Sequence, residues 1–142
     1  MAEASKLADA LIAVDERELR YRTGFAVSGE ATGWLVREHP GVDDPAVLRA
    51  FHLAILSRVD ALWQEERSTI QAGLANLYRL MSAADLVATR SFIASPSGQN
   101  FGRLLVGADI RLLDAVATAT LYRRLGPELP ELLDAAQKSA AE

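Results

Sequence analysis

The sequence predicts an all-α protein, a single-domain helical bundle of about six helices over residues 1–142. A chain of 142 residues suits one domain and is long enough to bury a hydrophobic core. Alanine and leucine are abundant while β-branched residues are few, which favours helices over strands. Apolar residues recur at intervals of three and four through much of the chain, which is the spacing of one helix face.

The first two helices are predicted over about Ser5–Ala13 and Glu16–Glu38. Asp15 stands directly before the second helix, where an acidic side chain can cap the first turn. Three glycines lie inside this second helix: Gly24, Gly29 and Gly33. Each lowers helix stability by about 1 kcal/mol relative to alanine. We therefore expect the helix to bend or break near Gly29, unless the small residues let a neighbouring helix approach closely.

The clearest loop is HPGVDDP, which precedes the longest apolar stripe. Asp44 is in the capping position and Pro45 in the first position of the next helix. The stripe then continues at helical spacing over about Pro45–Met81. One unbroken helix of that length would extend for about 54 Å, more than the width of a compact domain. We expect either a kink near Ser68–Gly73 or an extended arrangement of the kind found in dimers.

A serine-proline turn separates the next two helical patterns. Ser82 is expected to cap a helix that ends before Ser95-Pro96-Ser97-Gly98. Phe92 and Phe101 flank that turn and are expected to pack against each other. The second of these helices is predicted from Pro96 to about Leu125, with Gly126 as a left-handed terminator. A last helix is predicted over about Glu131–Ala140.

The segment Leu74–Leu113 resembles the bacterial family of domain of unknown function 2059 (DUF2059). That family has a leucine-tyrosine helix end, a capped helix, an aromatic residue and a Ser-Pro-x-Gly turn. The matching residues are Leu77, Tyr78, Ser82, Asp85, Phe92, Ser95, Pro96 and Gly98. Met81 and Ile93 stand where the family usually has aromatic residues, and both keep an apolar side chain. The resemblance implies an α-helical protein that is exported to the periplasm or outside, and it supplies no catalytic residues.

Composition excludes several classes of function. The formal net charge is −4, so there is no basic surplus for nucleic-acid binding. The absence of cysteine excludes disulfides, thiol catalysis and cysteine metal sites. No apolar run approaches the length of a membrane span. The N-terminal sequence is not an intact signal peptide, which fits either a processed exported protein or a cytoplasmic one.

The search for a reactive site yields few candidates. His39 and His52 are not spaced as a metal-binding pair, and no catalytic, metal or cofactor site is predicted. Glu66 interrupts the long apolar stripe, so it is either a buried acid, with Arg58 or Arg67 beside it, or the place where the stripe breaks.

The sequence favours a non-enzymatic helical module that binds a protein partner or a second copy of itself. The alternative is a carrier or sensor of a small apolar ligand in a cavity between helices. The residues considered for that cavity or for an interface are Trp34, Phe51, Trp63, Glu66 and Gly73.

Overall fold

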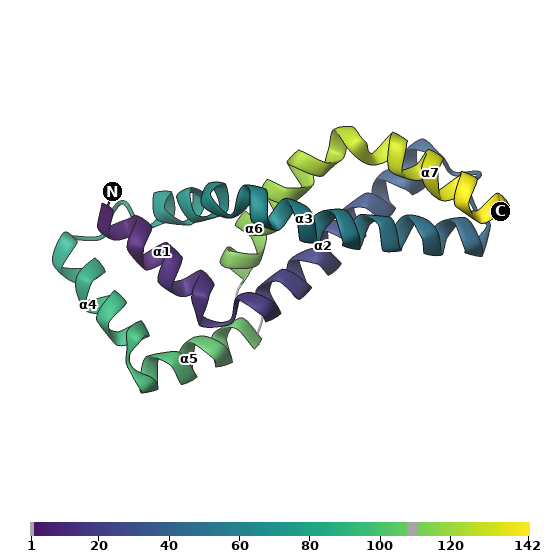
Figure 1. Ribbon diagram of the computed structural model, residues 1–142. Coiled ribbons are helices and arrows are strands. Elements are labelled where there is room, and N and C mark those ends of the chain that lie inside the picture. Colours follow the sequence, from purple (N-terminus) through teal and green to yellow (C-terminus); the bar gives the residue numbers. More distant parts are fainter. Residues whose placement is uncertain (1, 108–110) are drawn as a thin grey trace. The chain divides into compact units, whose positions relative to one another are not determined.

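The structure is a computed structural model that describes residues 2–107 and 111–142, and every regular element in these ranges is a helix. The prediction of an all-α fold is therefore confirmed. In chain order the helices are α1 (Ala2–Val14), α2 (Glu16–Glu38), α3 (Pro45–Leu77), α4 (Ala83–Ala94), α5 (Pro96–Gly107), α6 (Arg111–Leu125), the short 3-10 helix η1 (Gly126–Glu128) and α7 (Leu129–Ala141) (Figure 1).

The chain divides into two compact units. Unit 1 consists of Met1–Tyr21 and Arg67–Ala117, and unit 2 consists of Arg22–Glu66 and Thr118–Glu142. Helices α2, α3 and α6 each contribute residues to both units.

Unit 1 contains α1 packed against both α4 and α5, which meet at a sharp corner (Figure 1). Its buried apolar side chains include Leu7, Ile12, Ile70, Leu74, Leu86, Ile93 and Leu113. One face of α5 is covered by α1, because a Cβ atom added at Gly102 would lie 2.8 Å from a methyl carbon of Val14. Such a short distance leaves no room for a side chain there.

In unit 2, the part of α2 from Arg22 onward packs against the part of α3 up to Glu66. Its buried apolar side chains include Val27, Leu35, Phe51, Ile55, Leu62, Trp63, Leu121, Leu125, Leu129 and Leu133. A Cβ atom added at Gly24 would lie 3.6 Å from Leu56, so here the small residue does allow close approach between helices. Gly29 has no such neighbour, and α2 continues through it as a helix.

Local signals in the sequence place several helix ends correctly. Helix α2 has the predicted bounds, and the Asp15 carboxylate accepts a hydrogen bond from the backbone N–H of Glu18 at 3.4 Å. Asp44 caps α3 by accepting from the N–H of Ala46 at 2.9 Å. Ser82 has extended backbone angles and caps α4 by accepting from the N–H of Asp85 at 3.1 Å.

Of three expectations about helix ends, one is correct to within four residues, one is not tested and one is wrong. Helix α3 ends at Leu77, before Met81, in a turn where the Tyr78 N–H donates to the carbonyl of Ala75. The single helix predicted from Pro96 to Leu125 is described in two parts, α5 and α6, and its continuity is not tested because positions 108–110 lie outside the described residues. Gly126 begins the 3-10 helix η1 and has no positive φ, so it is not a left-handed terminator.

The apolar stripe of α3 is buried within the chain. Ile55, Leu62, Ile70 and Leu74 are each 0% exposed, and the helix continues without interruption through the region where a kink was one expectation. These buried side chains are therefore not available to a second copy, whereas Leu48 and Leu77, near the two ends of the helix, are 38% and 44% exposed. In the part of the chain that the structure describes, no helix is both long and apolar enough to cross a membrane.

Candidate functional site

The corner between α4 and α5 is built around Ser95. This residue has extended backbone angles, with φ −73° and ψ 158°, and it ends α4. Its hydroxyl donates to the carbonyl of Phe92 at 2.6 Å and accepts from the backbone N–H of Gly98 at 3.1 Å. One side chain thus caps the end of α4 and the start of α5, and Pro96 takes the first position of α5, where no N–H is needed.

Gly98 lets the two helices meet at this corner. A Cβ atom added there would overlap the carbonyl oxygen of Phe92 and lie 2.8 Å from the Cα atom of Ile93. The contact is with backbone, which cannot rotate away as a side chain would. Gln99 adds a second link, because its side-chain amide donates to the carbonyl of Ile93 at 2.7 Å. The Ser-Pro-x-Gly sequence therefore lets the chain turn sharply between α4 and α5, as predicted.

Phe92 and Phe101 pack against each other across the corner, and this prediction is also confirmed. Their ring centroids lie 5.9 Å apart with an angle of 56° between the ring planes. Both rings remain about half exposed, at 46% and 47%, and Leu104, one turn beyond Phe101, is 68% exposed. We call the three side chains of Phe92, Phe101 and Leu104 the corner surface.

The aromatic residues considered for a ligand cavity lie elsewhere. Trp34 stacks on Phe51, with ring centroids 6.2 Å apart and an interplanar angle of 29°, and Trp63 is fully buried in the same unit. Gly73 belongs to unit 1, where a Cβ atom added to it would lie 2.9 Å from a methyl carbon of Val116. The structure thus brings Trp34 and Phe51 together as packed side chains of unit 2, and Gly73 is not one of their neighbours there.

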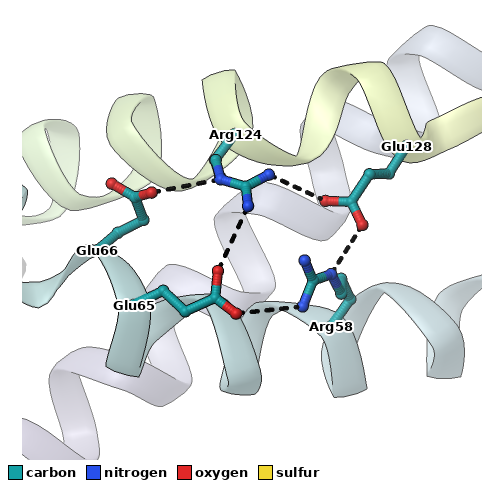
Figure 2. A network of polar contacts seen from close by, with 5 residues as sticks. All are labelled: Arg58, Glu65, Glu66, Arg124 and Glu128. Atoms are coloured by element: carbon teal, nitrogen blue, oxygen red, sulfur yellow. Dashed lines mark hydrogen bonds and ion pairs between the residues drawn. The ribbon is translucent and has the colours of Figure 1, made fainter.

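Glu66 belongs to a network of charged side chains in unit 2. Figure 2 shows Arg124 pointing toward three carboxylates, those of Glu65, Glu66 and Glu128, at distances of 3.4, 3.4 and 3.6 Å. Arg58 completes the network by contacting Glu128 at 2.8 Å and Glu65 at 3.8 Å. The sequence suggested Arg58 or Arg67 beside Glu66, whereas the observed partner is Arg124.

The network ties α3 to α6 and η1 by charge pairing. The hydrogen bond to the Glu128 carboxylate raises the pKa of Arg58 above its usual value, although burial opposes the charge. The members of the network keep between 20% and 49% of their side-chain surface exposed, so each pair contributes about 1 kcal/mol or less. Every carboxylate faces a guanidinium, which suits a structural brace better than acid–base catalysis.

Arg67 occupies a comparable structural position in unit 1. Burial disfavours its charge, but hydrogen bonds to Asp9 and Glu16 outweigh that effect and raise its pKa. The guanidinium lies 2.8 Å from the Asp9 carboxylate and 3.0 Å from that of Glu16. These contacts join the middle of α3 to the first two helices.

The structure also reveals a pair that the sequence did not predict. Ser28 Oγ and His52 Nδ1 lie 2.6 Å apart, with Ser28 only 5% exposed. Phe25 lies edge-on to the His52 ring, with 6.4 Å between centroids. The backbone carbonyl of Ser28 accepts a hydrogen bond from Thr32. The pair satisfies two polar groups between α2 and α3, and its residues are too far apart in sequence for any motif to signal it.

One open cavity of about 400 Å³ lies at the start of α2. Its described lining consists of Asp15, Arg17, Glu18 and Tyr21. This lining is mostly polar, so it does not match the apolar ligand considered from the sequence. In residues 2–107 and 111–142, no group of three or more histidine, cysteine or acidic side chains is arranged to hold a metal ion.

Comparison with protein-family models, with curated proteins and with solved structures finds no match to this chain. The resemblance to the DUF2059 family therefore stays a prediction from its motif residues. Function has to be inferred from the chain's own geometry, in which the corner surface is the most distinctive feature.

Proposed function

We propose that this chain is a non-enzymatic helical binding module and that the corner surface is the face it uses. The observation that carries the proposal is the pair of half-exposed phenylalanine rings held on a fixed corner. Aromatic side chains dominate the energetics of many binding surfaces. Because Ser95, Gly98 and Gln99 fix the corner, little conformational entropy is lost on binding.

The corner surface can supply a useful but modest free energy. Burying the exposed halves of Phe92 and Phe101 contributes about 1 kcal/mol each, and burying most of Leu104 contributes about 1–2 kcal/mol. A total of about 3–4 kcal/mol alone corresponds to a millimolar dissociation constant. We therefore expect a weak, reversible contact, or one that is strengthened by further interactions around these three side chains.

Two other functions, an enzyme and a carrier of an apolar ligand, have less support. An enzyme centred on Glu66 would need a free acid, and this carboxylate is paired with Arg124. A carrier of an apolar ligand would need space beside Trp34 and Phe51, and these two rings stack on each other. Native mass spectrometry of the purified protein tests the carrier directly, because a bound ligand would appear as added mass.

A photo-reactive side chain tests the binding module without assuming the partner. Benzoylphenylalanine replaces Phe101 in one variant and the comparably accessible Leu53 of α3, which is 58% exposed, in a control. After irradiation in the cells that make the protein, we expect protein or lipid adducts at position 101 and few at position 53. Equal labelling at the two positions would refute the choice of the corner surface.

The family resemblance adds a proposal about location. Similar proteins are exported bacterial proteins, so we propose that this chain works in the periplasm or outside the cell. Fractionating cells that express the natural gene tests this directly. Recovery of the protein with cytoplasmic markers would contradict it.

A further inference from the structure

The corner surface lies in a stretch of chain without negative charge. From Leu86 to Gly107 the sequence contains no aspartate or glutamate, although the whole chain has 19 acidic residues against 15 basic ones. The same stretch contains two arginines, Arg90 and Arg103. The corner is therefore locally cationic in a protein whose net charge is −4.

The two arginines differ in their partners. Arg90 lies 3.5 Å from the Glu3 carboxylate of α1, which balances its charge. Arg103 stands beside Leu104 in the sequence, and its guanidinium donates to the amide oxygen of Asn100 at 3.4 Å. Among the described residues, Arg103 has no carboxylate within ion-pair distance. Within the part of the chain that the structure describes, no carboxylate balances this positive charge, which can therefore face a partner that binds next to the corner surface.

This charge pattern narrows the choice of partner. A second copy that packed corner against corner would place Arg103 opposite another stretch without carboxylates, so its charge would stay unbalanced. The corner surface is a turn between two helices that carries half-exposed rings. A site that binds a partner helix is instead a groove. A bilayer surface with anionic headgroups supplies an apolar phase for the rings and negative charge for Arg103 at the same depth.

We infer that the corner surface binds anionic lipid surfaces, with Phe92, Phe101 and Leu104 entering the interface and Arg103 contacting the headgroups. This inference rests on the proposed function, since it names the partner of the same surface. Binding of this kind is peripheral and reversible, because three apolar side chains and one available cation cannot anchor a protein firmly.

Vesicle flotation tests the inference with defined lipids. The full chain is mixed with vesicles of phosphatidylcholine alone, or of phosphatidylcholine and phosphatidylglycerol in equal parts, at low and high salt. We expect binding to the anionic vesicles, and weaker binding as salt increases. Arg103→Gln should weaken it about fivefold, and Leu104→Ser roughly tenfold.

Matched controls come from unit 2. Arg49→Gln removes an exposed arginine of α3, and Leu53→Ser removes an exposed leucine of the same helix. Neither change should alter binding, and circular dichroism should show that all four variants keep their helices. Because all four positions are exposed, the variants are expected to fold.

Several outcomes would overturn the inference. These are no vesicle binding, equal binding to neutral and anionic vesicles, or equal losses in the corner and control variants. Protein adducts at position 101 without vesicle binding would leave the binding module intact and replace lipid by a protein partner. A dimer in light scattering that Leu104→Ser dissociates would likewise replace lipid by a second copy.

Discussion

Gly98→Ala is the sharpest test of how the corner is built. The new methyl group would overlap the Phe92 carbonyl oxygen and approach the Cα atom of Ile93. Both neighbours are backbone atoms of the last turn of α4, so α5 must shift as a body to make room. That shift would stretch two hydrogen bonds, from the Gly98 N–H to Ser95 and from Gln99 to the Ile93 carbonyl.

The expected loss in the free energy of unfolding of Gly98→Ala is the sum of three contributions. Overpacking at a closely packed contact costs about 1–3 kcal/mol. Loss of the Ser95 cap costs about 1 kcal/mol. Alanine regains about 1 kcal/mol over glycine in a helix, because glycine has the larger unfolded-state entropy. The expected net effect is a loss of about 1–3 kcal/mol in the free energy of unfolding.

Urea unfolding followed by two probes measures this loss. The two tryptophans, Trp34 and Trp63, both lie in unit 2, so their fluorescence reports that unit, while circular dichroism reports all helices. We expect the circular dichroism midpoint to fall by roughly 1 M. The fluorescence midpoint should fall equally only if the two units unfold together.

Gly29→Ala is the matched control. Gly29 also lies inside a helix, but an added Cβ atom there meets no atom within 4 Å. This substitution should stabilise the protein by about 1 kcal/mol. If Gly98→Ala were as stable as Gly29→Ala, the backbone contact would not exist and our account of the corner would be wrong.

Three further contacts are tested by substitution. Arg124→Gln should lower the free energy of unfolding by about 0.5–1 kcal/mol in low salt and by less in high salt. As a control, Arg123→Gln, on the exposed side of α6, should change the free energy of unfolding by less than about 0.5 kcal/mol. Ser28→Ala should cost about 1–2 kcal/mol in urea unfolding, because His52 loses its partner between α2 and α3. The hydrogen bond from Lys6 lowers the pKa of Glu3 in the folded state. The ionised Glu3 carboxylate therefore stabilises the fold above its usual pKa of 4.5, and this stabilisation is lost as the pH falls below that value. Acid titration by circular dichroism should therefore show a smaller loss of stability below pH 4.5 in Glu3→Gln, and an unchanged acid profile would contradict this interpretation.

The sequence predicted those parts of the fold that depend on neighbours in the chain. Helix α2 has the predicted bounds because its cap, Asp15, bonds to a residue three positions away. The corner was predicted for the same reason, since its bonds all connect residues between Phe92 and Gln99. Helix α3 ended early because the turn after Leu77 closes through backbone groups, with no proline or glycine to signal it.

Contacts between distant residues could not be predicted in this way. Glu66 and Arg124 are on different helices, and which arginine faces the acid depends on how α3 and α6 pack. The pairing of Ser28 with His52 depends likewise on the register of α2 against α3. Periodicity identifies the apolar face of a helix, but it does not specify which residue of a neighbouring helix packs against that face.

The location of a binding surface also depends on contacts between distant residues, so sequence periodicity does not predict it. The α3 stripe first indicated a dimer, yet Ile55 and Ile70 are fully buried within the chain, whereas Leu104 of the shorter α5 stays exposed. A binding surface at the corner then depends on both the side chains and the angle between the helices. Leu104→Ser should therefore reduce binding without loss of stability, while Gly98→Ala should reduce both, because it moves the intact rings apart. If Gly98→Ala lost stability but kept full binding, the corner angle would be a property of the fold with no part in recognition.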